Sequence, residues 1–302
     1  MITIVGAGRV GSSIALQIIE RELDDVTLID VIDGLPEGEA LDLGQVAAER
    51  GIDVKVFGSN NFESMKDSDI VVVTAGLARK PGMTRMDLLS KNASIMKSIC
   101  EKIKIYAKNS IVVPVANPLD VNTYVALKAT GFDSKRVFGM GGMLDLSRFK
   151  YILSNMTGIS GSSIQALVIG QHGESMLPLP RHSYAWGVPI TNFLSETQVK
   201  ESVEQTRQIA AKVIKLKGAT VYAPANGVAR MLDAIVKDKK SVIPVCAYLD
   251  GEYGVEGLCI GVPAIIGRDG ISKIIEVELN EEEKNMFNQG VNSIKEGITS
   301  LE

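Results

Sequence analysis

Cysteine is scarce in this sequence, with three residues among 302, and none of them forms a CxxC pair. Cys100, Cys246 and Cys259 all stand in apolar surroundings. An odd number of isolated cysteines provides neither a disulfide framework nor a zinc-ligand pattern. We therefore expect buried free thiols, no metal site and a reducing, cytoplasmic location.

Long hydrophobic runs and a secretion signal are also missing. The longest charge-free stretch, residues 151–171, is interrupted by Ser, Asn and Gly, whereas a membrane span needs about 18 to 20 apolar residues. The N-terminus begins Met-Ile-Thr-Ile-Val, without a cationic start or a small-residue cleavage site. We expect neither a membrane partner nor export.

A basic excess is absent as well. Lys and Arg number 32 and Asp and Glu number 36, which gives a net charge of −4, whereas a nucleic-acid-binding chain normally carries a strong basic stripe. The hydrophobic fraction of 45% is that of an ordinary globular protein. The charge balance therefore predicts no nucleic-acid partner. At about 150 residues per domain, the length predicts two domains.

What the first half does contain is an alternation of short β-branched runs with helical patterns. The expected strands are residues 2–5, 26–30, 54–57, 70–74, 111–115 and 137–139. Helical patterns at 10–22, 37–49, 86–108 and 120–130 separate most of them. Strands that are apolar throughout are typical of a parallel sheet covered by helices on both faces. This half therefore predicts an α/β fold with a doubly wound parallel sheet.

The second half changes character near Gly141. Helices are expected at 144–155, 196–217, 225–237 and 281–298, and strands at 164–169, 242–249, 258–262 and 274–277. Turn signals such as Asp250-Gly251 between the last strands favour antiparallel pairing. We expect two domains, residues 1–140 and residues 141–302, the second an α+β domain that shares a cleft with the first.

A glycine-rich turn follows the first expected strand and opens the first helix. Its residues are Gly6, Ala7, Gly8, Arg9, Val10 and Gly11. Glycines let the backbone approach a pyrophosphate closely, and the helix N-terminus supplies N–H groups and a partial positive charge. The arrangement predicts the dinucleotide site of a Rossmann domain, although such a turn is also compatible with a structural role, flavin or adenosylmethionine.

An acidic residue at the end of the second strand favours NAD as the dinucleotide. Asp30 lies 19 residues beyond Gly11, and no Lys or Arg follows it until Arg50. A carboxylate there accepts hydrogen bonds from the ribose hydroxyls of NAD and repels the extra phosphate of NADP. The alternative is a turn or capping residue.

His172, one of two histidines, stands between glycines in the segment GQHGE after an expected strand. A histidine exposed in this way can transfer protons near neutral pH. Asp145 is its best candidate partner, and Asp145 and Arg148 share one helix face at positions i and i+3. Considered singly, a loop histidine and a surface ion pair explain the same residues.

Cationic and amide side chains are expected at the carboxyl edge of the parallel sheet, where open α/β folds bind ligands. Arg79 and Arg85 lie in a Gly- and Pro-containing loop after the fourth strand, and Asn117 ends the fifth strand. These residues predict a cationic flap over the crevice. A solvated basic loop and an ordinary Asn-Pro turn are the alternatives.

Together these segments resemble the lactate and malate dehydrogenase family over essentially the whole chain, and within it the lactate-dehydrogenase-like malate dehydrogenases. The motifs that carry the resemblance are GAGRVG, LID, TAGLARKPGMTR, NPLD, LDLSRF, GQHGES and KGATVYAPANGVA. The resemblance implies an NAD-dependent oxidoreductase of the tricarboxylic acid cycle, a homodimer or homotetramer, acting on the dicarboxylates malate and oxaloacetate.

The same resemblance implies a role for each residue. His172 is similar to the proton donor and acceptor, Asp145 to the carboxylate that orients it, and Arg148 to the clamp on the substrate's 1-carboxylate. Arg85 is similar to the arginine that polarises the carbonyl, and Asn117 to the amide that contacts the substrate.

Further cofactor contacts are implied for Asn92 and for Val115 to Asn117. Arg79 stands where the family discriminates between substrates: Arg there implies a dicarboxylate, and Gln implies pyruvate. A guanidinium pairs bidentately with a second carboxylate, whereas leaving it buried and unpaired costs about 3–5 kcal/mol. That corresponds to a preference of roughly a hundredfold to several thousandfold.

Three alternatives remain open at this point. They are a lactate or other 2-hydroxyacid dehydrogenase, a non-catalytic NAD-binding sensor, and a methyltransferase, which explains neither the arginines nor the histidine. The sequence also departs from the family pattern at Glu174, at Lys150 and at Gly142-Met143. None of these departures removes a proposed catalytic group.

Overall fold

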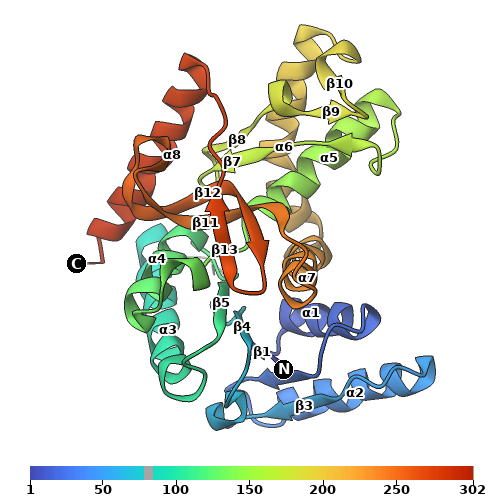
Figure 1. The fold of residues 1–302 in the computed structure, drawn as a ribbon, viewed down its shortest axis with the longest axis vertical. Coiled ribbons are helices and arrows are strands. Elements are labelled where there is room, and N and C mark those ends of the chain that lie inside the picture. Colours follow the sequence, from blue (N-terminus) through green and yellow to red (C-terminus); the bar gives the residue numbers. More distant parts are fainter. Residues whose placement is uncertain (78–83, 302) are drawn as a thin grey trace.

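The computed structural model describes residues 1–77 and 84–301, and Arg79 therefore lies outside the described residues. Segments of the first half of the chain lie at the bottom of Figure 1 and those of the second half at the top. The two halves are in contact, with α1 (Arg9–Glu20) of the first half packed against α7 (Tyr222–Val236) of the second.

The first sheet has five parallel strands in the order β3-β2-β1-β4-β5. The strands are β1 (Ile2–Val5), β2 (Val26–Ile29), β3 (Val56–Ser59), β4 (Ile70–Val73) and β5 (Ile111–Pro114). Besides α1, the helices that alternate with them are α2 (Leu35–Arg50), α3 (Arg85–Tyr106) and α4 (Leu119–Thr130). The predicted doubly wound parallel sheet is confirmed.

Alternate residues of these strands face two different helix layers. Ile4 of β1 belongs to the same buried cluster as Ile14 and Ile18 of α1, whereas the adjacent Val5 belongs to the cluster of Met96 of α3. Successive side chains of a strand point to opposite faces. Uninterrupted apolar runs are therefore needed to fill both layers.

The strand order reverses at β1, which lies between β2 and β4. Chain connections leave the carboxyl ends of β1 and β4 toward opposite faces of the sheet, and such a switch point opens a crevice between them. The glycine turn, Asp30 and the segment around Asn117 all follow the carboxyl ends of strands of this sheet.

The second half consists of antiparallel sheets and long helices. Its helices other than α7 are α5 (Gly142–Thr157), α6 (Glu196–Lys217) and α8 (Glu281–Thr299). Its strands are β6 (Ile164–Gln165), β7 (Val168–Gly170), β8 (Met176–Pro178), β9 (Tyr184–Ala185), β10 (Val188–Pro189), β11 (Ser241–Asp250), β12 (Glu256–Gly267) and β13 (Gly270–Ile274). One sheet has the order β11-β12-β7-β8 with β13 beside β12, and the other has the order β10-β9-β6. The predicted antiparallel pairing is confirmed.

The expected sixth parallel strand at 137–139 is wrong. Val137 makes a single parallel bridge to Val112, and Gly139 makes an antiparallel bridge to Cys246 of β11. This segment runs from one sheet to the other, so its backbone hydrogen bonds are divided between them instead of continuing one ladder.

Two other expected strands differ in extent. The run 164–169 is divided, because β6 pairs with β9 whereas β7 pairs with β8 and β12 in a different sheet. The last strand, expected at 274–277, is β13 at Gly270–Ile274. Only residues 268 and 269 separate β12 from β13, and Gly270 has a φ of +91°, so the hairpin turn is tighter than the sequence indicated.

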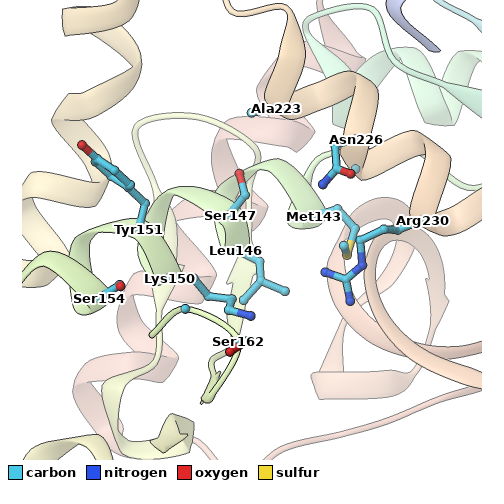
Figure 2. Close-up of a pocket in the computed structure, with 12 residues that line it drawn as sticks. Met143, Leu146, Ser147, Lys150, Tyr151, Ser154, Ser162, Ala223, Asn226 and Arg230 are labelled. Carbon is cyan, nitrogen blue, oxygen red and sulfur yellow. The ribbon is translucent and has the colours of Figure 1, made fainter. Parts of the chain in front are cut away.

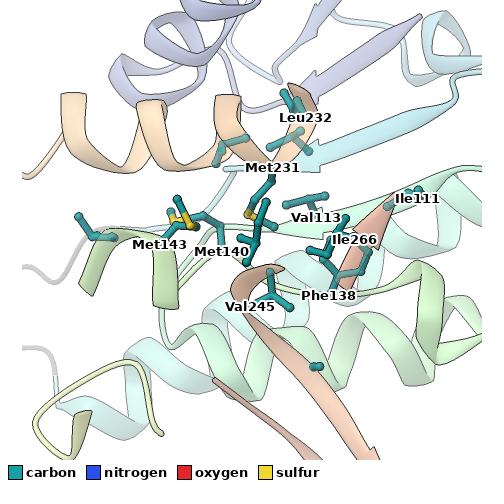
Figure 3. Close-up of a cluster of buried hydrophobic side chains, with 14 of the residues drawn as sticks. Ile111, Val113, Phe138, Met140, Met143, Met231, Leu232, Val245 and Ile266 are labelled. Atoms are coloured by element: carbon teal, nitrogen blue, oxygen red, sulfur yellow. The ribbon is translucent and has the colours of Figure 1, made fainter. Parts of the chain in front are cut away.

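The two halves share one hydrophobic core. Figure 3 shows side chains of β5, α5, α7, β11 and β12 packed together. Those labelled are Ile111, Val113, Phe138, Met140, Met143, Met231, Leu232, Val245 and Ile266. The halves are therefore packed directly on each other.

No helix within residues 1–77 and 84–301 is long and apolar enough to cross a bilayer. Cys100, Cys246 and Cys259 are free and buried, as expected.

Candidate active site

The structure brings His172 and Asp145 together, although they are 27 positions apart. The loop after β7 carries His172, and the first turn of α5 carries Asp145. The distance between Nδ1 of His172 and Oδ2 of Asp145 is 2.7 Å. The other oxygen of Asp145 accepts a hydrogen bond of 2.8 Å from Nη1 of Arg148, one turn along α5. The side chains of His172, Asp145 and Arg148 are 11%, 3% and 12% exposed, respectively.

The environment favours the charged form of the His172 ring. Burial alone lowers the pKa of the imidazole, but the charge of Asp145 and the hydrogen bond to it, together with the charge of Asp120, act in the opposite direction. The net result is a pKa raised above the ordinary value of 6.5. Because Nδ1 is bound to Asp145, Nε2 is the ring nitrogen left for exchanging a proton with a substrate.

Asp120, in the first turn of α4, is a neighbour of His172 that the sequence analysis did not single out. Its Oδ2 accepts a hydrogen bond of 2.8 Å from the backbone N–H of His172. Burial raises the pKa of the Asp120 carboxyl to about 6, although the His172 charge and this hydrogen bond lower it. The only sequence signal was its place in the NPLD motif.

Gly141 is a second neighbour that the analysis missed. A Cβ at Gly141 would lie 2.5 Å from Cδ2 of Leu119 and 2.9 Å from Cβ of His172. Contacts this short do not occur between real side chains, so only glycine lets the start of α5 approach the His172 ring so closely.

Arg85 is the first residue of α3, and its side chain forms an ion pair with Glu174, two residues after His172. The two side chains are 73% and 82% exposed, so the pair is solvated and of low stability. Glu174, a departure from the family pattern, thus holds Arg85 beside the His172 loop.

Asn117 follows the carboxyl end of β5, as expected, and the side chain of Asn92 on α3 is hydrogen bonded to its carbonyl oxygen. Asn92 is 3% exposed. Its Oδ1 accepts from the N–H of Leu77 at 2.8 Å, and its Nδ2 donates to the carbonyl oxygens of Leu77 at 3.1 Å and Asn117 at 2.7 Å. The amide of Asn92 therefore fixes the chain after β4 and β5. The side chains of Val115 and Asn117 reach the surface.

The glycine turn fits a pyrophosphate. Gly6 has a φ of +109°, and a Cβ on it would lie 2.5 Å from Oγ1 of Thr74, so the turn cannot be formed by a larger residue. A Cβ at Gly8 would meet nothing within 4 Å. Gly8 caps α1 without a side-chain hydrogen bond, and no acidic residue occupies the first turn. The first N–H groups of α1 thus face open space that an anion can fill.

Asp30 is fixed directly beside this turn. Its Oδ2 accepts from the N–H of Ala7 at 2.8 Å and its Oδ1 from the N–H of Ile32 at 3.0 Å. The carboxylate is therefore held where a ribose next to the pyrophosphate would reach it.

The remaining departures from the family pattern all lie on α5. A Cβ at Gly142 would lie 2.9 Å from the carbonyl oxygen of Pro244, so a residue without a side chain is required there. Lys150 lines a cavity of about 410 Å³ between α5 and α7, together with Arg230 and Ser147. Figure 2 shows this cavity beside the face of α5 that carries residues 147, 150, 151 and 154. Neither Asp145 nor Arg148 lines it.

Comparison with known proteins gives consistent matches over the whole chain. Residues 1–139 match the family described as lactate/malate dehydrogenase, NAD binding domain, and residues 142–302 match its alpha/beta C-terminal domain. The malate dehydrogenase of Caldivirga maquilingensis is 48% identical over 303 residues, covering 100% of this chain and 98% of that protein.

Two solved structures also resemble this chain over almost its whole length. The malate dehydrogenase of Aeropyrum pernix superposes with a TM-score of 0.96 at 45% identity, covering 100% of both chains. The lactate dehydrogenase of Cryptosporidium parvum, complexed with lactic acid and NAD, gives a TM-score of 0.95 at 35% identity, covering 99% of this chain and 97% of that one.

Proposed function

Because the chain belongs to the lactate/malate dehydrogenase family, we propose that it is an NAD-dependent malate dehydrogenase, which interconverts malate and oxaloacetate with His172 as proton donor and acceptor. The buried arrangement of His172, Asp145 and Arg148 is the observation that carries this proposal. Full-length relatives that are 41–48% identical to the chain bear the name malate dehydrogenase, which supports the dicarboxylate substrate.

The first half of the chain holds the cofactor. NAD supplies the hydride acceptor for malate oxidation, and its reduced form supplies the hydride for the reverse reaction. The uncapped N-terminus of α1 and the open backbone at Gly8 bind the pyrophosphate. Asp30, fixed by the N–H groups of Ala7 and Ile32, accepts hydrogen bonds from the ribose and repels a 2′-phosphate.

Arg148 binds the substrate's 1-carboxylate. One of its N–H groups is used by Asp145, and a guanidinium retains further donors in a planar fork that matches a carboxylate. The bond to Asp145 fixes the orientation of that fork, so the reacting carbon is placed in a defined position relative to His172.

Arg85 polarises the substrate carbonyl after it leaves Glu174. The exposed ion pair between them is weak, so a bound ketoacid competes for the guanidinium at little cost. Arg79, which lies outside the described residues, pairs with the second carboxylate of oxaloacetate. Asn117 supplies a further polar contact at the carboxyl edge of β5.

His172 donates its proton from Nε2 to the carbonyl oxygen of oxaloacetate as the carbon is reduced. Asp145 holds the ring by Nδ1 and stabilises its charged form, which is the form required at the start of this step. In malate oxidation the neutral ring accepts the hydroxyl proton, and the imidazolium that forms is stabilised by the same carboxylate.

A lactate dehydrogenase is the less supported alternative, because Arg79 has no partner in pyruvate and relatives that are 46% and 48% identical to the chain are named malate dehydrogenase. A non-catalytic NAD-binding sensor would not need the buried pair of His172 and Asp145. We also propose that the protein is cytoplasmic and forms a homodimer or homotetramer, in accord with its three buried free cysteines and its family.

The decisive experiment follows the absorbance of NADH and NADPH with oxaloacetate and with pyruvate, in parallel. We expect rapid oxidation of NADH with oxaloacetate and a much slower reaction in the other three combinations. Faster turnover of pyruvate would favour the lactate alternative. Binding of NADH without turnover of either substrate would favour the sensor.

A further inference from the structure

The carboxyl group of Asp120 lies behind the His172 loop and is used on only one of its two oxygens. Its Oδ2 accepts the 2.8 Å hydrogen bond from the backbone N–H of His172. Its Oδ1 is buried and accepts no hydrogen bond from the described residues. The residue as a whole is 4% exposed.

The other charged and titratable groups around Asp120 come from four elements. They are His172 after β7, Asp145 and Arg148 on α5, Cys246 on β11 and Cys259 on β12. The thiols of Cys246 and Cys259 are free and buried. The pKa of Cys246 is raised by burial, by its hydrogen bond to Cys259, and by the charge of Asp120 and a hydrogen bond to that carboxyl group. The Cys246 thiol therefore stays neutral. Asp145 is already bound on both oxygens, to His172 and to Arg148.

The backbone N–H of His172 needs only a neutral oxygen as its acceptor, and an asparagine at position 120 would provide one. A carboxylate in a dry interior is costly unless a positive charge faces it. The other polar contact of the Asp120 carboxyl group is the neutral thiol of Cys246, so what the carboxylate provides beyond an amide is negative charge. The positive charge that acts on the Asp120 carboxyl group is that of the protonated His172 ring.

We propose that Asp120 is a second positioning carboxylate of the active site, which holds the His172 backbone with one oxygen and stabilises the imidazolium with its charge. This inference rests on the proposed role of His172 and extends it. His172 then lies between two carboxylates, of which Asp145 fixes the ring and Asp120 fixes the main chain. The arrangement keeps the ring protonated for oxaloacetate reduction.

The substitution Asp120→Asn separates charge from structure. The amide oxygen of Asn can accept the same hydrogen bond from the His172 N–H, and its NH2 group takes the place of the unpartnered oxygen. The variant therefore preserves the contact and removes the charge. The chain has only two histidines, so the His172 ring can be titrated by NMR in isotope-labelled protein with His182 as an internal reference.

We expect the pKa of His172 to fall by about 1 pH unit in Asp120→Asn, the lower end of what an opposite charge within ~4–6 Å produces. Above that pKa, kcat/KM for oxaloacetate should be about tenfold lower than in the wild type. Malate oxidation, which needs the neutral ring, should instead extend to lower pH. Opposite shifts in the two directions distinguish loss of charge from general damage.

Two further variants complete the test. Thr123→Val removes a buried hydroxyl from the same helix, where it donates to the carbonyl of Leu119, and should leave the His172 titration unchanged. Asp120→Ala removes both the charge and the acceptor and should additionally raise KM. An unchanged His172 pKa in Asp120→Asn would overturn the inference. Because the titration is measured without substrate, this result is independent of whether the protein turns over oxaloacetate.

Discussion

The carboxylate of Asp145 lies 2.7 Å from Nδ1 of His172, in an environment where both side chains are almost fully buried. A carboxylate in this position fixes which ring nitrogen carries a proton and stabilises the imidazolium.

Replacing Asp145 by Asn should therefore lower kcat for oxaloacetate reduction by roughly a hundredfold or more, within the range attributed to acid–base catalysis. The amide keeps the shape of the carboxylate but not its charge. Steady-state kinetics at saturating NADH measures the effect. The matched control is Ser147→Ala, two residues along α5, whose hydroxyl donates to the carbonyl of Leu144. Activity of Asp145→Asn close to that of the wild type would exclude Asp145 from the mechanism.

The raised pKa of His172 predicts opposite pH profiles for the two reaction directions. Oxaloacetate reduction uses the protonated ring, so its kcat/KM should be constant at low pH and fall about tenfold per pH unit above the raised pKa. Malate oxidation uses the neutral ring, so its kcat/KM should rise through the same interval. Both profiles are recorded in the same buffers, and a parallel rise of the two would contradict the assignment.

Arg79→Gln should reduce kcat/KM for oxaloacetate by roughly a hundredfold to several thousandfold, because the second carboxylate loses its bidentate partner. Pyruvate, which has no second carboxylate, should lose much less or gain. The ratio of the two kcat/KM values is the measurement. Equal losses on both substrates would show that Arg79 supports the loop without selecting the substrate.

Asp30→Ser should narrow the preference for NADH over NADPH. The serine removes the charge that repels a 2′-phosphate while keeping a hydrogen-bonding group beside the N–H of Ala7. Relative kcat/KM values for the two cofactors at fixed oxaloacetate measure the change. Asp33→Ser, three residues further along, is the control, and an unchanged ratio in Asp30→Ser would place cofactor selection elsewhere.

Asp120→Asn should also be more stable than the wild type near neutral pH. Burial raises the pKa of this carboxyl from the ordinary 3.8 to about 6, so the folded state holds a proton that the unfolded chain has already released. The charged carboxyl group therefore lowers the free energy of unfolding of the wild type. This destabilisation is absent below about pH 4, grows up to about pH 6 and then stays constant at up to about 3 kcal/mol. Urea unfolding of both proteins at several pH values measures it. A difference independent of pH would contradict this linkage.

Much of the first sheet could be predicted because its information is local. Apolar runs, a glycine turn and helical patterns follow each other in order, and each is decided within about ten residues. The positions of Asp145 and Arg148 on one helix face could be predicted for the same reason. Asp145 was a candidate partner of His172 because it shares a helix face with Arg148, and the family resemblance implied that the two residues meet.

The parts that could not be predicted depend on contacts between distant segments. Asp120 lies in the first turn of a helix, where a carboxylate is common because it complements the helix dipole. Its second role is revealed only by the folded chain, in which it contacts His172 across 52 positions of sequence. The resemblance implied a cofactor contact for Asn92, but no local pattern indicated that its amide is hydrogen bonded to the backbone of Leu77 and Asn117. Both are matters of tertiary packing.

The segment 137–140 is hydrogen bonded to both halves of the chain. Phe138 and Met140 donate to the carbonyl oxygens of Val112 and Pro114, at 3.2 and 2.9 Å, and Gly139 exchanges two backbone hydrogen bonds with Cys246. A hinge rotation between the halves would break these bonds and open the common core. Movement of one half against the other would therefore have to separate main-chain hydrogen bonds as well as buried side chains.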